Sequence, residues 1–157
     1  MKIDRRTFLA GTGAGLAGLA LPGAALAQAR GPLVMWKDPS CGCCAHWGER
    51  VEAAFRGRLQ VIPTADMQAL KRSHGVPQDL QSCHTALIHG VVVEGHVPPA
   101  DIQRLVAARP RPFRGLAVPG MPLGSPGMDV GHNERQRYQV FAFGGAGGRR
   151  AVFATHG

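Results

Sequence analysis

The most restrictive feature of this sequence is a cluster of three cysteines, Cys41-Gly42-Cys43-Cys44, at the junction of a strand and a helix. The apolar run Leu33–Trp36 ends at Asp38-Pro39-Ser40, which is typical of a short buried strand followed by a turn. Beyond the cysteines, apolar residues recur at helical spacing from Trp47 until Gly57. The thiols therefore lie at a helix N-terminus, where free backbone N–H groups and the helix dipole stabilise thiolates.

The rest of the chain continues the alternation of strands and helices. Residues 59–63 predict a strand, residues 65–74 a helix, residues 85–88 and 91–94 a hairpin, and residues 98–106 a helix bounded by Pro110. Residues 111–137 predict a loop rich in Pro and Gly, and residues 138–143 and 151–155 a final hairpin. The sequence thus predicts an α/β domain of order βαβαββα with an additional C-terminal β-hairpin.

The N-terminus has the form of an export signal. An Arg5-Arg6 pair precedes an uncharged segment that runs to Ala29, and Ala25-Leu26-Ala27 offers a cleavage site. The arginine pair resembles the twin-arginine signal, which exports folded proteins across the bacterial inner membrane. A membrane anchor fits less well, because five glycines make the segment only mildly apolar. We expect a signal peptide at residues 1–27, a single periplasmic domain at residues 28–157, and no stable membrane insertion after cleavage.

Charge and length narrow the range of functions. The chain has 157 residues and a formal net charge of +8, but its Lys and Arg residues are scattered as singles and pairs. A nucleic-acid partner is therefore not indicated. A mature chain of this length buries a core without needing disulfides to fold, so its cysteines are free for chemistry.

Four thiols are expected to converge. Cys41 and Cys44 form a Cys-x-x-Cys pair, and Cys43 is a third soft donor. Cys83 precedes the strand at residues 85–88, and in a βαβαββα sheet that position lies beside the end of the first strand. Thiolates favour Cu(I), and Zn(II) is the main competitor.

Three other interpretations of the cysteines remain open. Two structural disulfides are one, although a vicinal 43–44 bridge has poor geometry. A thiol-disulfide oxidoreductase with Cys41 as nucleophile and Cys44 as resolving thiol is another. The third is a structural zinc module with four cysteine ligands.

The sequence gives weaker support for metal ligands other than the four cysteines. His84 adjoins Cys83, although alternation along a strand would point neighbouring side chains to opposite faces. His96 ends the hairpin segment and fits a surface histidine equally well. Met121 offers a soft thioether in a Pro- and Gly-rich loop, where methionine more often fills the core. His46 lies off the face of Cys44 and is expected to face solvent.

Taken together, these residues give a chain that resembles the CopG-type periplasmic copper-resistance proteins. The resemblance rests on five motifs in order: residues 36–44, Gly75-Val76-Pro77, residues 82–86, residues 93–98 and residues 115–122. It implies a thioredoxin-like fold and a role in copper tolerance, sequestration or Cu(I)/Cu(II) redox handling.

The resemblance also implies a ligand set and partners. Cys41, Cys43, Cys44 and Cys83 would be the thiolate ligands, and His84, His96 and Met121 additional donors, for one or more Cu(I) ions. The expected partners are copper ions and periplasmic copper-handling proteins, and whether the protein also catalyses turnover stays open.

Overall fold

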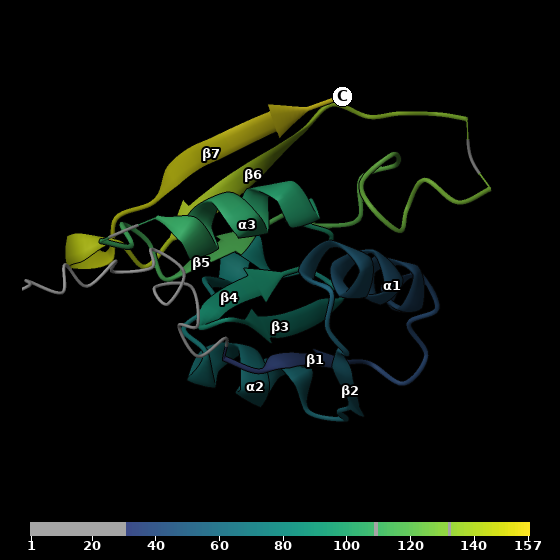
Figure 1. Ribbon diagram of the computed structural model, residues 1–157, viewed down its shortest axis with the longest axis horizontal. Coiled ribbons are helices and arrows are strands. Elements are labelled where there is room, and N and C mark those ends of the chain that lie inside the picture. The colour runs from purple at the N-terminus through teal and green to yellow at the C-terminus, as the bar shows by residue number, and fades with distance from the viewer. Residues whose placement is uncertain (1–30, 109, 132) are drawn as a thin grey trace, which may run out of the picture.

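Seven strands form one mixed sheet in the order β2-β1-β3-β4-β5-β6-β7 in the computed structural model, which describes residues 31–108, 110–131 and 133–157 (Figure 1). The elements are β1 (Leu33–Lys37), α1 (Cys43–Phe55), β2 (Gln60–Pro63), α2 (Met67–Ser73), β3 (His84–Ile88), β4 (Val91–Glu94), α3 (Pro99–Ala107), β5 (Gly115–Ala117), β6 (Tyr138–Phe143) and β7 (Ala151–His156), with short 3-10 turns at Gln78–Leu80 and Ala146–Gly148. The predicted α/β class is confirmed, and the first seven elements occur in the predicted order.

Strand β1 lies near the centre of the first half of the sheet. It pairs in parallel with β2 and antiparallel with β3, so that Lys37 at its end lies opposite His84 at the start of β3. Pairing on both sides explains why its first three residues are a continuous buried run rather than an alternating one. The end of β1 and the start of β3 therefore lie at the same edge of the sheet.

Helices cover both faces of the sheet, as alternation along β1 shows. The Met35 side chain points toward α1, where its methyl group lies 3.7 Å from the position of a Cβ at Gly48. The next residue, Trp36, points the other way, and its ring centroid is 4.9 Å from that of His74 at the end of α2. Helix α3 lies beside α1 (Figure 1). The thiol-bearing helix thus shares its face with α3.

Helix α1 is held by one apolar face. Its residues Trp47, Val51 and Phe55 are buried in the main core, and the Trp47 indole donates a hydrogen bond to the Val97 carbonyl at 2.9 Å. The helix ends at Phe55 with Arg56 in the left-handed region, slightly before the predicted stop at Gly57. This packing fixes the orientation of the helix N-terminus and of the cysteines on it.

The prediction of an uninterrupted loop over residues 111–137 is wrong at Gly115–Ala117. These three fully buried residues form β5, which pairs in parallel with β4 and antiparallel with β6. A Cβ at Gly115 would lie 2.5 Å from the Val92 carbonyl oxygen, so only glycine allows the two strands to approach. Strand β5 joins the predicted C-terminal hairpin, observed as β6 and β7, to the rest of the sheet.

The predicted signal peptide, residues 1–27, lies outside the described residues. Among the residues that are described, no helix combines the length and apolar character needed to cross a bilayer.

Candidate metal centre

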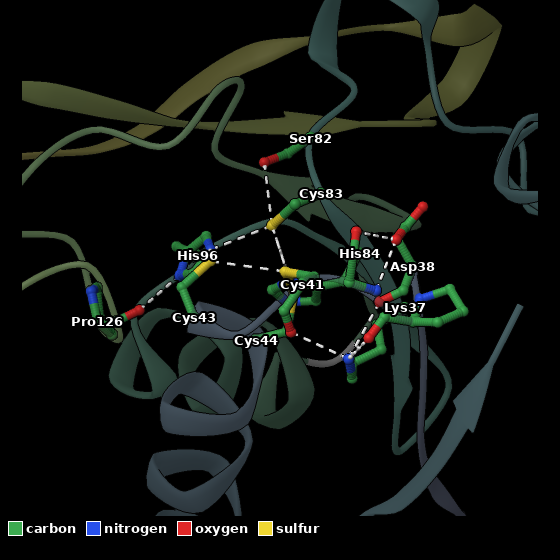
Figure 2. The surroundings of a disulfide bond; sticks show 12 residues. Lys37, Asp38, Cys41, Cys43, Cys44, Ser82, Cys83, His84, His96 and Pro126 are labelled. Atoms are coloured by element: carbon green, nitrogen blue, oxygen red, sulfur yellow. Dashed lines mark hydrogen bonds between the residues drawn. A yellow bond between two sulfur atoms is a disulfide. The ribbon is translucent and has the colours of Figure 1, made fainter.

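The backbone of the turn between β1 and α1 is fixed by hydrogen bonds with the side chains of its own residues. The Lys37 ammonium group donates to the carbonyl oxygens of Asp38 and Cys41, both at 3.0 Å (Figure 2). The Asp38 carboxylate accepts from the Ser40 amide at 2.8 Å, and hydrogen bonds from Ser40 lower the pKa of Asp38. These contacts fix the backbone around Cys41 while no side chain caps the helix at Gly42. The helix N-terminus is therefore left open toward the thiols.

Cys41 and Cys44 are joined by a disulfide, and Cys43 and Cys83 are free. The interpretation as two structural disulfides is therefore wrong. Cys44 is fully buried on the inner face of α1, as the sequence predicts, whereas Cys41 is partly exposed. A ligand set that includes all four thiolates requires this disulfide to be reduced.

Cys83 meets the cysteine turn from the neighbouring strand. Its Sγ lies 3.7 Å from Cys44 Sγ, and Cys43 Sγ lies 3.5 Å from Cys41 Sγ. All four sulfur atoms lie within 4.8 Å of one another. Burial, followed by the nearby Cys43 thiol, raises the pKa of Cys83 to about 12. This thiol keeps its proton at neutral pH until a metal or another electrophile displaces it.

His84 lies in the same cluster. It is the first residue of β3 and points to the α1 face, with its ring centroid 4.4 Å from that of Trp47. Cys83 precedes the strand, so alternation does not separate the two side chains, and His84 Nδ1 lies 3.3 Å from Cys83 Sγ. Burial lowers the pKa of His84 well below its ordinary value, so the ring is neutral at pH 7. Its buried Nε2 has no hydrogen-bond partner among the described residues.

His96 is fully buried, so the interpretation as a surface histidine is wrong. Its Nε2 lies 3.2 Å from Cys83 Sγ and 3.6 Å from Cys43 Sγ, and its Nδ1 lies 2.8 Å from the Pro126 carbonyl oxygen (Figure 2). A carbonyl only accepts, so Nδ1 carries the proton and Nε2 presents a lone pair to the sulfurs. Burial also lowers the pKa of His96, which favours this neutral form.

The loop after β5 completes the site. Gly127 has a positive φ of 88°, and a Cβ there would lie 2.9 Å from the Trp47 backbone nitrogen and 3.0 Å from the Cys43 carbonyl oxygen. Only glycine allows the loop to lie this close to the start of α1. That contact brings the Pro126 carbonyl to His96.

A hollow of about 480 Å³ opens beside the thiols, and its lining includes Cys41, Cys43, Cys83, Lys71 and Met121. Met121 is 50% exposed, so it lies at the rim and does not fill the core. His46 is exposed, as predicted, and its Nδ1 lies 3.7 Å from a Glu49 carboxylate oxygen.

Sequence reasoning missed the buried residues Lys71 and Glu94 next to the thiols. The signal available in the sequence was an acidic residue that follows the apolar strand Val91–Val93 directly. Nothing in the sequence pairs that residue with a lysine on a different helix.

The arrangement brings four soft sulfurs together with two neutral imidazoles. Besides the group of four cysteines, Cys83, His84 and His96 form a second set of donors within 4.8 Å of one another. Thiolate and imidazole are ligands for copper and zinc, and thiolates in particular select Cu(I). The residues present therefore fit a soft metal ion.

A family model described as a protein of unknown function, DUF411, matches residues 80–128. No match is found among curated proteins.

Two solved structures resemble the chain over most of its length. One, titled copper resistance protein copG, form 2, is 40% identical with a TM-score of 0.73 and covers 81% of this chain and 100% of its own. The other, form 1 of a protein with the same title, is 42% identical with a TM-score of 0.71 and covers 80% of this chain and 96% of its own. At this identity and coverage, the chain belongs to the CopG family of copper-resistance proteins.

Proposed function

We propose that this protein is an exported copper-binding protein that holds Cu(I) through cysteine thiolates for copper tolerance, sequestration or redox handling. The observation that carries the proposal is the convergence of Cys41, Cys43, Cys44 and Cys83 at one helix N-terminus. The similarity to copper-resistance proteins supports copper as the metal.

The two histidines extend this ligand set. His84 and His96 are both neutral, and His96 Nε2 faces two of the sulfurs. Met121 at the rim offers a further soft donor to an ion entering through the hollow. Four thiolates that bridge metal ions hold more than one Cu(I), and zinc is the competitor for the same donors.

The proposal includes a cellular location and a fold type. Residues 1–27 act as a twin-arginine signal peptide, and residues 28–157 form one thioredoxin-like domain in the periplasm. The order β2-β1-β3-β4, with helices on both faces, supports the thioredoxin-like assignment. Metal binding through all four thiolates requires an external dithiol that reduces the Cys41–Cys44 disulfide by exchange and itself leaves as a disulfide.

A second candidate function is that of a thiol-disulfide oxidoreductase, which the Cys41–Cys44 disulfide favours. Reduced Cys41, at the hollow, would attack a substrate disulfide, form a mixed disulfide and release one substrate thiolate. Buried Cys44 would then attack Cys41 Sγ, release the second substrate thiolate and restore the protein disulfide.

The deciding experiment is an anaerobic titration of reduced residues 28–157 with Cu(I) against a colorimetric chelator, with Zn(II) run in parallel. We expect the protein to outcompete the chelator for Cu(I). Cys83→Ser should weaken binding by more than the roughly 10- to 100-fold that follows loss of a residue that merely orients a ligand. The control His46→Gln removes an exposed histidine near the start of the same helix and should bind as the wild type does.

Two results would contradict the proposal. Unchanged Cu(I) affinity in Cys83→Ser would rule out a site with four thiolates. Failure of the wild type to compete for Cu(I), together with disulfide reductase activity that Cys41→Ser abolishes, would establish the oxidoreductase instead.

A further inference from the structure

A buried ion pair lies beside the hollow that the thiols line. The Lys71 ammonium nitrogen is 2.5 Å from Glu94 Oε1, and the two side chains are only 3% and 0% exposed. Lys71 belongs to α2 and Glu94 ends β4, so the pair joins a helix to the sheet. Lys71 also lines the hollow that contains Cys41 and Cys83.

Stability alone is a weak reason for such a pair. Removing two charges from water costs several kcal/mol per ion, and well-packed apolar residues of similar volume often stabilise a fold equally well or better. The contacts made by the pair indicate what else it does.

The Glu94 carboxylate holds the chain on both sides of Cys83-His84. Its Oε1 accepts a hydrogen bond from the Ser82 backbone amide at 2.6 Å, and its Oε2 accepts one from the Thr85 hydroxyl at 2.7 Å. Thr85 lies directly opposite Glu94 in the antiparallel pair. The Lys71 ammonium donates to the same Thr85 hydroxyl at 3.1 Å, which completes a closed network.

This placement matters because Cys83 precedes the first residue of β3. The sheet therefore does not fix Ser82 and Cys83, although it fixes His84 and the residues after it. The Ser82 side chain has its own tether, since its hydroxyl donates to the Gly120 carbonyl. The Glu94 carboxylate supplies a second contact, by accepting the hydrogen bond from the Ser82 backbone amide.

We propose that Glu94 is a positioning residue that holds Cys83 at the cysteine turn for metal binding, and that Lys71 balances its buried charge. That the bound group is a metal ion rests on the proposed function. The clamp, meaning the hydrogen bonds from the Ser82 amide and the Thr85 hydroxyl to the Glu94 carboxylate, stands independently of it. Residues that orient metal ligands through hydrogen bonds commonly account for 10- to 100-fold of metal affinity.

Two double variants separate positioning from general stability. In Lys71→Met/Glu94→Leu, both charges and both acceptors of the clamp are lost, but the volume is kept. In Lys71→Met/Glu94→Gln, the charges are lost, but an amide oxygen still accepts from Ser82 and the amide group still reaches Thr85. A surface control, Arg150→Met/Asp79→Asn, removes an exposed ion pair with a 2.7 Å N···O distance.

Each protein is reduced and titrated anaerobically with Cu(I), and its unfolding is followed in urea without metal. We expect the leucine variant to bind Cu(I) at least about tenfold more weakly than wild type, with the glutamine variant recovering most of that loss. We expect the two double variants to differ in Cu(I) affinity while their urea unfolding midpoints stay close together. A purely structural role would change the affinity and the midpoint in parallel. Equal Cu(I) affinity in the two double variants would overturn the proposal.

A second measurement does not depend on copper. The clamp restrains Cys83, so its rate of alkylation by iodoacetamide, measured by mass spectrometry on metal-free protein, should rise in the leucine variant and stay near the wild-type rate in the glutamine variant. Thr85→Val removes one arm of the clamp, keeps the side-chain shape and should give an intermediate rate even if the double variants fold poorly.

The two readouts distinguish failure of the inference from failure of the proposed function. Faster alkylation in a protein whose wild type does not bind Cu(I) would keep the clamp and reject copper binding. Unchanged alkylation in the leucine variant and in Thr85→Val would reject the clamp, whatever the wild type binds.

Discussion

Acid should destabilise this domain through His84, and the variant His84→Phe should remove that effect. His84 is fully buried, and burial holds its pKa well below the ordinary value. The folded protein therefore keeps this ring neutral, whereas the unfolded chain takes up a proton below about pH 6.5. Stability from a group with a lowered folded pKa is present above the unfolded pKa and is lost as the pH falls.

The size of the effect follows from proton linkage. Once the unfolded histidine is protonated and the folded one is not, each pH unit costs up to about 1.4 kcal/mol of unfolding free energy. Averaged over the partial titration between pH 6.5 and 5.5, the loss from His84 is about 1 kcal/mol. His96, whose pKa is also lowered, adds in the same direction.

The assay is urea unfolding of metal-free disulfide protein at pH 7.5, 6.5 and 5.5. Phenylalanine keeps a ring against Trp47 but does not titrate, so His84→Phe should lose about 1 kcal/mol less than wild type between pH 6.5 and 5.5. Titrating groups that do not contact residue 84 are common to both proteins and cancel in this difference. The exposed control His46→Gln should follow the wild type. Parallel pH curves for wild type and His84→Phe would refute the reasoning.

Two further predictions concern the thiols and the loop over them. Because burial raises the pKa of Cys83 to about 12, Cu(I) binding must release the proton of this thiol. The apparent Cu(I) affinity should therefore rise across pH 6–9, by about tenfold per pH unit for this one proton. A pH-independent affinity in buffered chelator competition would contradict this. Gly127→Ala adds a Cβ 2.9 Å from the Trp47 nitrogen and 3.0 Å from the Cys43 carbonyl oxygen at a positive φ, and should cost about 1–3 kcal/mol in urea unfolding. Gly131→Ala has a similar φ of 78° but open space around it, so an equal loss in both variants would show that backbone strain, and not the contact with α1, is responsible.

Much of the fold was accessible from local patterns. The spacing of apolar residues predicted the order of the first seven elements, and the Cys-x-x-Cys pair was correctly placed at a helix start. Strand β5 was missed because a run of three residues, Gly115–Ala117, carries no period and forms a strand only through its neighbours β4 and β6. Local periodicity describes single elements and not their pairing.

The sequence likewise predicted one part of the candidate site and not another. Proximity of Cys83 to the cysteine turn followed from the predicted sheet order, and the sulfur distances agree with it. The burial of His96 did not follow, because it depends on a carbonyl at Pro126 that reaches the ring across a loop. The pairing of Lys71 with Glu94 likewise joins two elements that the sequence does not relate.

The sequence by itself determined the soft chemistry of this protein, since residue types and their spacing place three thiols at one helix N-terminus and a fourth before a neighbouring strand. Tertiary structure alone decided which histidine nitrogen faces the sulfurs and what holds Cys83 in place. The physical reason is range. Helix and strand periods act over a few residues, whereas a histidine tautomer and a buried ion pair depend on atoms that only the folded chain brings within a few ångströms.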